Sequence, residues 1–382
     1  MIESEYIKTV DGKTYIDYLG KQTVINPDEF VMISDELYDD LIKRYYEKPH
    51  ISEVYDQFRD MCMKGILNKS VINKYYIRDL QAKVVIYHNK YSIEEALQCK
   101  ELVSYIMRYV IGKKKNLKVF TSDDPLDNFE TALRLSAIGI ASKPSDFPVK
   151  TVVEVLRKYN VNGNYYDFSC GWGDRLMGSM ISGVNYHGTD PNYLLVDKLK
   201  EMYSDYQKAN YTTGRVFPKA EFNCQGSEHF IPRYENKMGV AFSSPPYFDL
   251  EDYKIGDQSY KEGMNYEQWK NGYFTQTIEN IFKYVVEGGY FLINVKSFNG
   301  HDLRKDATEI GKAVGFTHLR DEPIIGRGSR VMGVKKKDKD GQNFTLMSNS
   351  VGQSKENIKI DSIEYMMVFR KGEKKVFMNQ LF

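Results

Sequence analysis

Residues 165–174 of this chain have the sequence Tyr-Tyr-Asp-Phe-Ser-Cys-Gly-Trp-Gly-Asp. A short apolar run ends in an acid, and two glycines, Gly171 and Gly173, follow before helical residues begin. Glycine lets the backbone approach a ligand closely, and the first turn of a helix presents free N–H groups. The stretch therefore predicts a strand, a ligand-binding turn and a helix in succession.

Candidate helices and strands alternate around this stretch from about residue 125 onward. The expected helices include 148–159 and 266–284, and the expected strands are 165–168, 183–190, 219–224, 238–243, 289–295, 315–319 and 363–370. This alternation is typical of a mostly parallel sheet. We predict an α/β fold with a Rossmann-like seven-stranded sheet in a domain covering 121–382, interrupted by a polar insert at 326–360.

Residues 1–120 are predicted to form a separate, mainly helical accessory region. Its first part has two short extended runs, 13–18 and 22–25. A helix is expected to begin at Ser92 and to end near Gly112, because Ser92 and Glu95 have the spacing of a capping box and apolar residues recur at three- and four-residue steps.

The composition excludes several classes of protein. With 42% hydrophobic and 27% charged residues, the chain is neither disordered nor fibrous, and its net charge of +1 excludes a uniformly basic DNA-coating protein. Cysteines and histidines are scattered, so we expect reduced thiols and no metal. The first residues lack a secretory signal pattern, and no run is long enough to span a membrane, so we expect a cytoplasmic protein, bacterial or in a phage-infected host.

Asp190 strengthens the ligand-binding interpretation of the glycine turn. It follows the second predicted strand about 20 residues after the turn, where a carboxylate can hold a ribose diol. A dinucleotide fits less well, because a third glycine is missing and Asp174 and Arg175 stand where a pyrophosphate needs bare backbone. The expected ligand is an adenosine without phosphates.

A second motif, Ser243-Ser-Pro-Pro-Tyr247, comes directly after the apolar run 238–243. Proline fixes φ and has no N–H, so two in succession give a stiff loop whose carbonyls are free to accept hydrogen bonds. Ser244 adds a side-chain oxygen, and Tyr247 adds a flat ring. A planar group with an amino substituent could be stacked and hydrogen-bonded there.

Together these motifs resemble those of S-adenosylmethionine-dependent DNA methyltransferases that modify N4 of cytosine or N6 of adenine. In that family the first loop has the pattern D-P-F-C-G-S-G-T and the catalytic motif D/N/S-P-P-Y/F/W; here they stand at 167–174 and 244–247. The resemblance covers roughly residues 140–370 and implies a class I methyltransferase fold. Phe168, Ser169, Trp172 and Asp174 depart from the family pattern, which leaves contacts inside the loop open.

The resemblance also implies site residues. Catalysis is expected from Ser244, Pro245, Pro246 and Tyr247. Binding of S-adenosylmethionine is expected from Phe147, Pro148, Asp167, Ser169, Cys170, Gly171, Trp172, Gly173, Asp190, Gln225, Gly226 and Ser244. The serine that opens the catalytic motif favours N4 of cytosine, with N6 of adenine second. The target base would be flipped out of the duplex to reach the motif.

Contacts with double-stranded DNA are expected mainly from the insert. Its cationic residues are Arg327, Arg330, Lys335, Lys336 and Lys337. Three alternatives remain at this stage: methylation of guanine N2 in RNA or of a protein glutamine, an inactive subunit that only binds cofactor and DNA, and an N-terminal region that recruits a partner such as a restriction nuclease.

Overall fold

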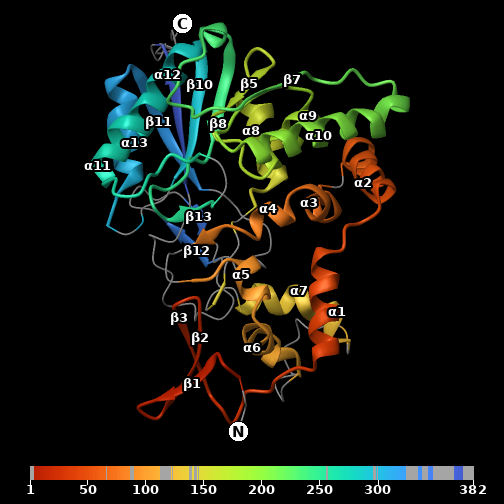
Figure 1. Ribbon diagram of the computed structural model, residues 1–382. Helices are drawn as coiled ribbons and strands as arrows, with labels where there is room; N and C mark the ends of the chain where they lie inside the picture. The colour runs from red at the N-terminus through yellow and green to blue at the C-terminus, as the bar shows by residue number, and fades with distance from the viewer. Residues whose placement is uncertain are drawn as a thin grey trace, which may run out of the picture. The chain divides into compact units, whose positions relative to one another are not determined.

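The computed structural model describes residues 4–65, 67–86, 90–111, 122, 124–136, 140–141, 144, 146–254, 257–295, 298, 300–323, 334–337, 343–346 and 365–372 (Figure 1). The chain forms two compact units. The first comprises 1–57, 69–145 and 249–256, and the second comprises 58–68, 146–248 and 257–382.

The second unit is built on a seven-stranded sheet, as the sequence predicts. Its strands are β5 (Asn164–Asp167), β6 (Asn185–Thr189), β7 (Ala220–Asn223), β8 (Met238–Ser243), β10 (Val285–Val295), β11 (Phe316–Pro323) and β14 (Tyr365–Lys371). The order across the sheet is β11-β14-β10-β8-β5-β6-β7, and β14 is antiparallel to both of its neighbours while the other pairings are parallel. This is a Rossmann-like class I methyltransferase fold.

The strand order places a topological switch point between β5 and β8. After β5 the chain proceeds to β6 and β7 on one side, and after β8 it proceeds to β10 on the other. In open α/β sheets a crevice forms outside the carboxyl ends of the strands where the order reverses. The two motifs singled out in the sequence follow β5 and β8, so the fold brings them to this position.

The helices of this unit begin and end where local chemistry dictates. They are α8 (Val149–Tyr159), α9 (Asp174–Ser182), α10 (Tyr193–Asn210), α11 (Tyr266–Trp269), α12 (Gln276–Tyr284) and α13 (Leu303–Ala313), with 3-10 turns at Tyr211–Thr213 and Pro232–Tyr234. Side chains of Asn192 and Asp302 accept N–H groups at the starts of α10 and α13. Gly173 and Gly183 flank α9 with positive φ.

The predicted helix at 266–284 is wrong in one respect. A π-helix, Lys270–Thr275, separates α11 from α12. Trp269, Tyr273 and Phe274 are all buried in this segment. The π-helix thus interrupts the regular helical hydrogen bonding in a segment whose aromatic side chains are in the core.

The first unit combines a small antiparallel sheet with helices. Its strands β1 (Ile7–Val10), β2 (Lys13–Tyr18) and β3 (Lys21–Ile25) are joined by two tight turns, Asp11-Gly12 and Leu19-Gly20, whose residues all have positive φ. A second, two-stranded pair joins β4 (Val85–Ile86) to β9 (Glu251–Asp252). The sequence predicts β2 and β3 but misses β1.

The helices of the first unit include α1 (Asp35–Tyr46), α3 (Ser70–Tyr76), α4 (Arg78–Gln81), α5 (Ile93–Leu97), α6 (Lys100–Ile111) and α7 (Pro125–Ser136), while α2 (Ile51–Lys64) crosses the boundary between the units. The capping box of Ser92 and Glu95 is present. The single helix expected after it is wrong, because α5 ends at Leu97, whose carbonyl accepts the Tyr38 hydroxyl, and α6 restarts at Lys100.

Part of the predicted insert is described as an antiparallel pair, β12 (Val334–Lys337) with β13 (Asn343–Leu346). The stretch that contains this pair leaves β11 at Pro323 and enters β14 at Tyr365, and these two residues are direct partners in the sheet. Among the helices in the described ranges, none has both the length and the apolar character needed to cross a membrane.

Candidate active site

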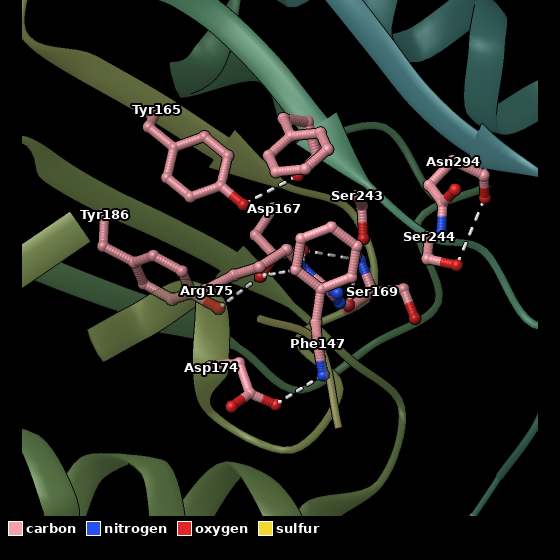
Figure 2. A network of polar contacts seen from close by, with 11 residues as sticks. Phe147, Tyr165, Asp167, Ser169, Asp174, Arg175, Tyr186, Ser243, Ser244 and Asn294 are labelled. Carbon is pink, nitrogen blue, oxygen red and sulfur yellow. Dashed lines mark hydrogen bonds and ion pairs between the residues drawn. The ribbon is translucent and has the colours of Figure 1, made fainter. Parts of the chain in front are cut away.

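The glycine loop, residues 167–174, leads from the end of β5 into α9 (Figure 2). Gly171 and Gly173 have φ of +58° and +83°, in the left-handed region that side chains other than glycine disfavour. A Cβ on Gly173 would also lie 3.0 Å from the side chains of Leu199 and Met202. Both glycines are therefore required by the backbone path, as expected for a loop that presents its N–H groups at the start of a helix.

Asp167 closes β5 and is completely buried. Its two carboxylate oxygens each lie 3.0 Å from Nε of Arg175, and the hydroxyl of Tyr186 donates to it at 2.9 Å (Figure 2). Burial raises the pKa of Asp167 above its usual range, and the Arg175 guanidinium opposes that shift. Asp167 is thus held in an ion pair inside the loop, where its carboxylate stabilises the loop's shape.

The carbonyl of Ser169 receives two donors from different elements. Nη2 of Arg175 donates to it from α9, and Oγ of Ser243 donates to it at 3.1 Å from the end of β8. Arg175 and Ser243 are both buried. This role of Arg175 was not predicted from the sequence, although a cation directly after a glycine turn that follows a buried acid is a signal for it.

Phe147 and Pro148 lie on the segment before α8, and Pro148 is the residue that precedes the helix. The N–H of Phe147 donates to Oδ2 of Asp174 at 3.0 Å. The ring of Phe147 lies 5.5 Å from that of Phe242 and 5.7 Å from Cζ of Arg175. The segment is thereby anchored onto the glycine loop, next to residues of the same network (Figure 2).

The side chains at 168, 170 and 172 of the glycine loop are buried. They belong to Phe168, Cys170 and Trp172, and Phe168 lies in the core with its ring 6.0 Å from that of Phe291. The phenyl ring at 168 is therefore part of the sheet's hydrophobic packing rather than a surface for a ligand.

Asp190 follows β6 and is 8% exposed. The N–H of Asn192 donates to its Oδ1 at 3.0 Å. Burial raises the pKa of Asp190 to about 7, while backbone N–H groups of Asn192 and Gly171 pull it down. Its charge therefore changes near neutral pH. When ionised, this buried carboxylate at the carboxyl end of β6 can accept hydrogen bonds from hydroxyl groups of a ligand.

The loop after β7 contains the predicted residues Gln225 and Gly226, both partly exposed, and Nε2 of Gln225 donates to the carbonyl of His229 at 3.0 Å. A residue that was not predicted from the sequence, Asn280, holds this loop. Nδ2 of Asn280 donates to the carbonyls of Ser227 and Glu228 at 3.0 and 2.8 Å. The signal was present, because Asn280 is a polar residue on the buried face of an amphipathic helix.

The acceptor loop, residues 244–247, follows β8. Oγ of Ser244 donates to the main-chain carbonyl of Asn294, in β10, at 3.2 Å (Figure 2). Pro245 is buried and Pro246 is partly exposed. Tyr247 is 9% exposed, and its ring centroid lies 5.7 Å from that of Phe298. The following residue, Phe248, has φ of +34°, which marks a sharp turn in the backbone directly after the motif.

The candidate DNA-binding residues are less well placed. Arg327 and Arg330 lie outside the described residues, and for Lys335, Lys336 and Lys337 the structure gives only the backbone of β12. Their contact with DNA stays a prediction.

No protein-family model matches this sequence. No curated protein matches it either. Among solved structures, a TehB-like SAM-dependent methyltransferase from Corynebacterium glutamicum is similar at 14% identity and a TM-score of 0.35, over 64% of this chain and 97% of that one. The N-methyltransferase NodS from Bradyrhizobium japonicum is similar at 10% identity and a TM-score of 0.35, over 59% and 94%.

The [4+2]-cyclase SpnF is similar at 13% identity and a TM-score of 0.34, over 46% of this chain. The chain spans 61% of the length of that cyclase.

Proposed function

We propose that this chain is a DNA methyltransferase that uses S-adenosylmethionine to methylate the exocyclic amine of a flipped base, with N4 of cytosine as the first candidate and N6 of adenine as the second. One observation carries the proposal. The Ser244 hydroxyl donates its hydrogen to the carbonyl of Asn294, so its lone pairs remain to accept hydrogen from a substrate amine. This acceptor follows β8, next to the glycine loop that follows β5.

The residues after β5 and β6 fit the proposed cofactor. Asp190, when ionised, would accept the two ribose hydroxyls, and the N–H groups of the loop at Gly171–Gly173 would face the amino-acid end of the ligand. Gln225 and Gly226 would lie beside the adenine ring. When bound, S-adenosylmethionine supplies a methyl group attached to a positively charged sulfur.

The acceptor loop would make the substrate amine more nucleophilic. A base amine is a weak nucleophile because its lone pair is delocalised into the ring. If Oγ of Ser244 and the carbonyl of Pro245 accept its two hydrogens, the nitrogen becomes more pyramidal and its lone pair becomes localised on the nitrogen, directed to one face of the ring. The two prolines fix these acceptors before substrate binds, so little reorganisation is needed.

A base stacked in a duplex cannot reach this loop, so we propose that it is flipped out. Tyr247 would stack on the extruded base, and such stacking contributes about 1 to 3 kcal/mol per base. The Tyr247 ring is inclined at 58° to that of Phe298. We further propose that the insert, including β12, contacts the DNA backbone, and that the protein acts beside a restriction nuclease in the cytoplasm.

The test is incubation with labelled S-adenosylmethionine and unmethylated duplex DNA of mixed sequence, followed by digestion and mass spectrometry of the nucleosides. N4-methylcytosine or N6-methyladenine is the expected product, and its identity settles the base. Ser244→Ala should abolish most of the label, whereas Ser179→Ala, a buried serine on α9 that donates to the carbonyl of Val184, should not.

Parallel incubations with RNA and with a protein mixture separate the alternatives. Label in N2-methylguanine or in methylglutamine, with none in DNA, would contradict the DNA assignment while keeping the acceptor loop's chemistry. Cofactor binding without labelled product in any polymer would identify an inactive binding subunit.

A further inference from the structure

We propose that Arg175 and Ser243 are positioning residues that tie the glycine loop to the acceptor loop through one shared acceptor, the carbonyl of Ser169. The inference rests on the function proposed above, because it concerns how the cofactor side and the substrate side of that site are held at a fixed separation. Neither residue needs to touch a ligand to act in this way.

Arg175 connects α9 to two points of the glycine loop. Its Nε lies 3.0 Å from both carboxylate oxygens of Asp167, and its Nη2 donates to the carbonyl of Ser169 (Figure 2). Arginine can do this because its donors form a rigid planar fork. Lysine has a single ammonium group at the end of a flexible chain, so it can serve one of these acceptors well but not both.

Ser243 connects the same carbonyl to β8. It is completely buried, donates to Ser169 at 3.1 Å, and directly precedes Ser244. Ser244 is in turn bonded to Asn294 of β10. Two sets of hydrogen bonds, joined by the peptide bond between Ser243 and Ser244, therefore connect β10 with Ser169, Arg175 and the end of β5.

This arrangement predicts different effects on transfer and on binding. Group transfer requires reacting atoms about 3 to 3.5 Å apart, and a displacement of about 1 Å can lower the rate roughly 100-fold. The proposed binding of the cofactor depends on Asp190 and on the N–H groups at Gly171–Gly173, whereas Ser243 bonds to the carbonyl of Ser169. Loss of the Ser243 hydroxyl should therefore reduce transfer and spare binding, whereas loss of the Arg175 fork should reduce both.

Ser243→Ala is the first test, with Ser179→Ala as its matched control because Ser179 is equally buried and also donates to a main-chain carbonyl. We expect kcat for DNA methylation to fall about tenfold in Ser243→Ala, with the Kd of S-adenosylmethionine, measured by calorimetry, unchanged within about twofold. Ser179→Ala should change neither, although both variants lose a similar amount of thermal stability.

Arg175→Lys is the second test, with Arg304→Lys, another arginine paired with an aspartate, as its control. The Arg175 variant should bind S-adenosylmethionine about tenfold more weakly and also lose kcat, while Arg304→Lys keeps both. The double variant Arg175→Lys/Ser243→Ala should lose less kcat than the product of the single effects, because both side chains act on one carbonyl.

The outcomes separate this inference from the proposed function. Wild-type protein that methylates DNA, with Ser243→Ala at full kcat and Arg175→Lys at unchanged Kd, would overturn the inference and leave the function standing. If the two single effects on kcat simply multiply in the double variant, the two side chains do not act through the same carbonyl, and the shared-acceptor part of the inference is wrong. Wild-type protein that binds no S-adenosylmethionine would overturn both.

Discussion

The glycine loop and the acceptor loop both follow central strands of one sheet, yet they are stiffened by different means. The glycine loop is held by buried polar groups: the Asp167–Arg175 ion pair, two donors on the Ser169 carbonyl, and the Gly171 N–H near Asp190. The acceptor loop is held by Pro245 and Pro246 in its own backbone. We therefore expect the shape of the glycine loop to depend on pH and on buried polar side chains, whereas the backbone conformation of the acceptor loop depends mainly on its two prolines.

The largest effect expected is that of Ser244→Ala. It removes one of two acceptors for the substrate amine while the prolines keep the loop in place, so we expect kcat to fall roughly 100-fold with cofactor affinity unchanged. Single-turnover methylation with saturating DNA measures the change. A loss of cofactor affinity in this variant would show that Ser244 also helps to hold the glycine loop in place.

The second largest effect is expected on the pH dependence of cofactor affinity, which Asp190 should determine. Because Asp190 has a pKa of about 7 and would bind the ribose hydroxyls as an anion, affinity for S-adenosylmethionine should rise between pH 6 and pH 8. Asp190→Asn should weaken binding by roughly 10-fold or more at pH 8, since hydrogen bonds to charged groups contribute about 1.5 to 3 kcal/mol, and should flatten the pH profile. Calorimetric titrations at several pH values would decide this.

The raised pKa of Asp190 should also make the folding stability of the protein depend on pH when no ligand is added. A carboxyl whose folded pKa is raised from 3.8 to about 7 contributes stability that is fully present below about pH 4 and is lost as the pH rises through 7. Asp190→Asn should therefore unfold at a higher temperature than wild type at pH 8 and at nearly the same temperature at pH 4. Equal shifts at both pH values would contradict the raised pKa.

A smaller effect is expected at Tyr247. Replacement by alanine should lower turnover about tenfold and leave cofactor binding unchanged, because a stacking surface of about 1 to 3 kcal/mol is lost. Tyr247→Phe keeps the ring and should retain most turnover. Unchanged turnover in the alanine variant would refute the stacking role and leave the proline geometry as the loop's main contribution.

The smallest effect lies outside both loops. Changing Lys335, Lys336 and Lys337 to alanine should leave both loops and kcat at saturating DNA intact, and should flatten the dependence of DNA affinity on salt by about 0.9 in slope for each phosphate contact removed. Fluorescence anisotropy between low and moderate salt measures the slope. An unaltered slope would count against phosphate contact by this strand.

The order of helices and strands in the second unit could be predicted because apolar runs and turn residues are local signals. Strand β8 matches its predicted range, and β5, β6 and β7 lie within theirs to within one residue. The π-helix at Lys270–Thr275 could not be predicted, because the apolar periodicity of 266–284 is the same whether each N–H bonds four or five residues back.

The site was predictable in its motifs and less so in its contacts. Glycines, prolines and Asp190 carry backbone or charge requirements that a sequence displays directly. The roles of Arg175, Ser243 and Asn280 depend on which carbonyls the fold brings within reach, since each donates to main-chain oxygen of a residue 6, 74 or 53 positions away in sequence. Every residue has a main-chain carbonyl, so the sequence around the acceptor does not indicate which side chain will donate to it.

The pairing of Pro323 with Tyr365 has a consequence for the evolution of this chain. Because the intervening stretch departs from and returns to the same point of the sheet, its exchange for another segment leaves the register of β11 and β14 undisturbed, and the entropy of closing the loop changes only slowly with its length. The sheet can thus keep its strand pairing while the segment between these two residues is replaced by one of another length or sequence.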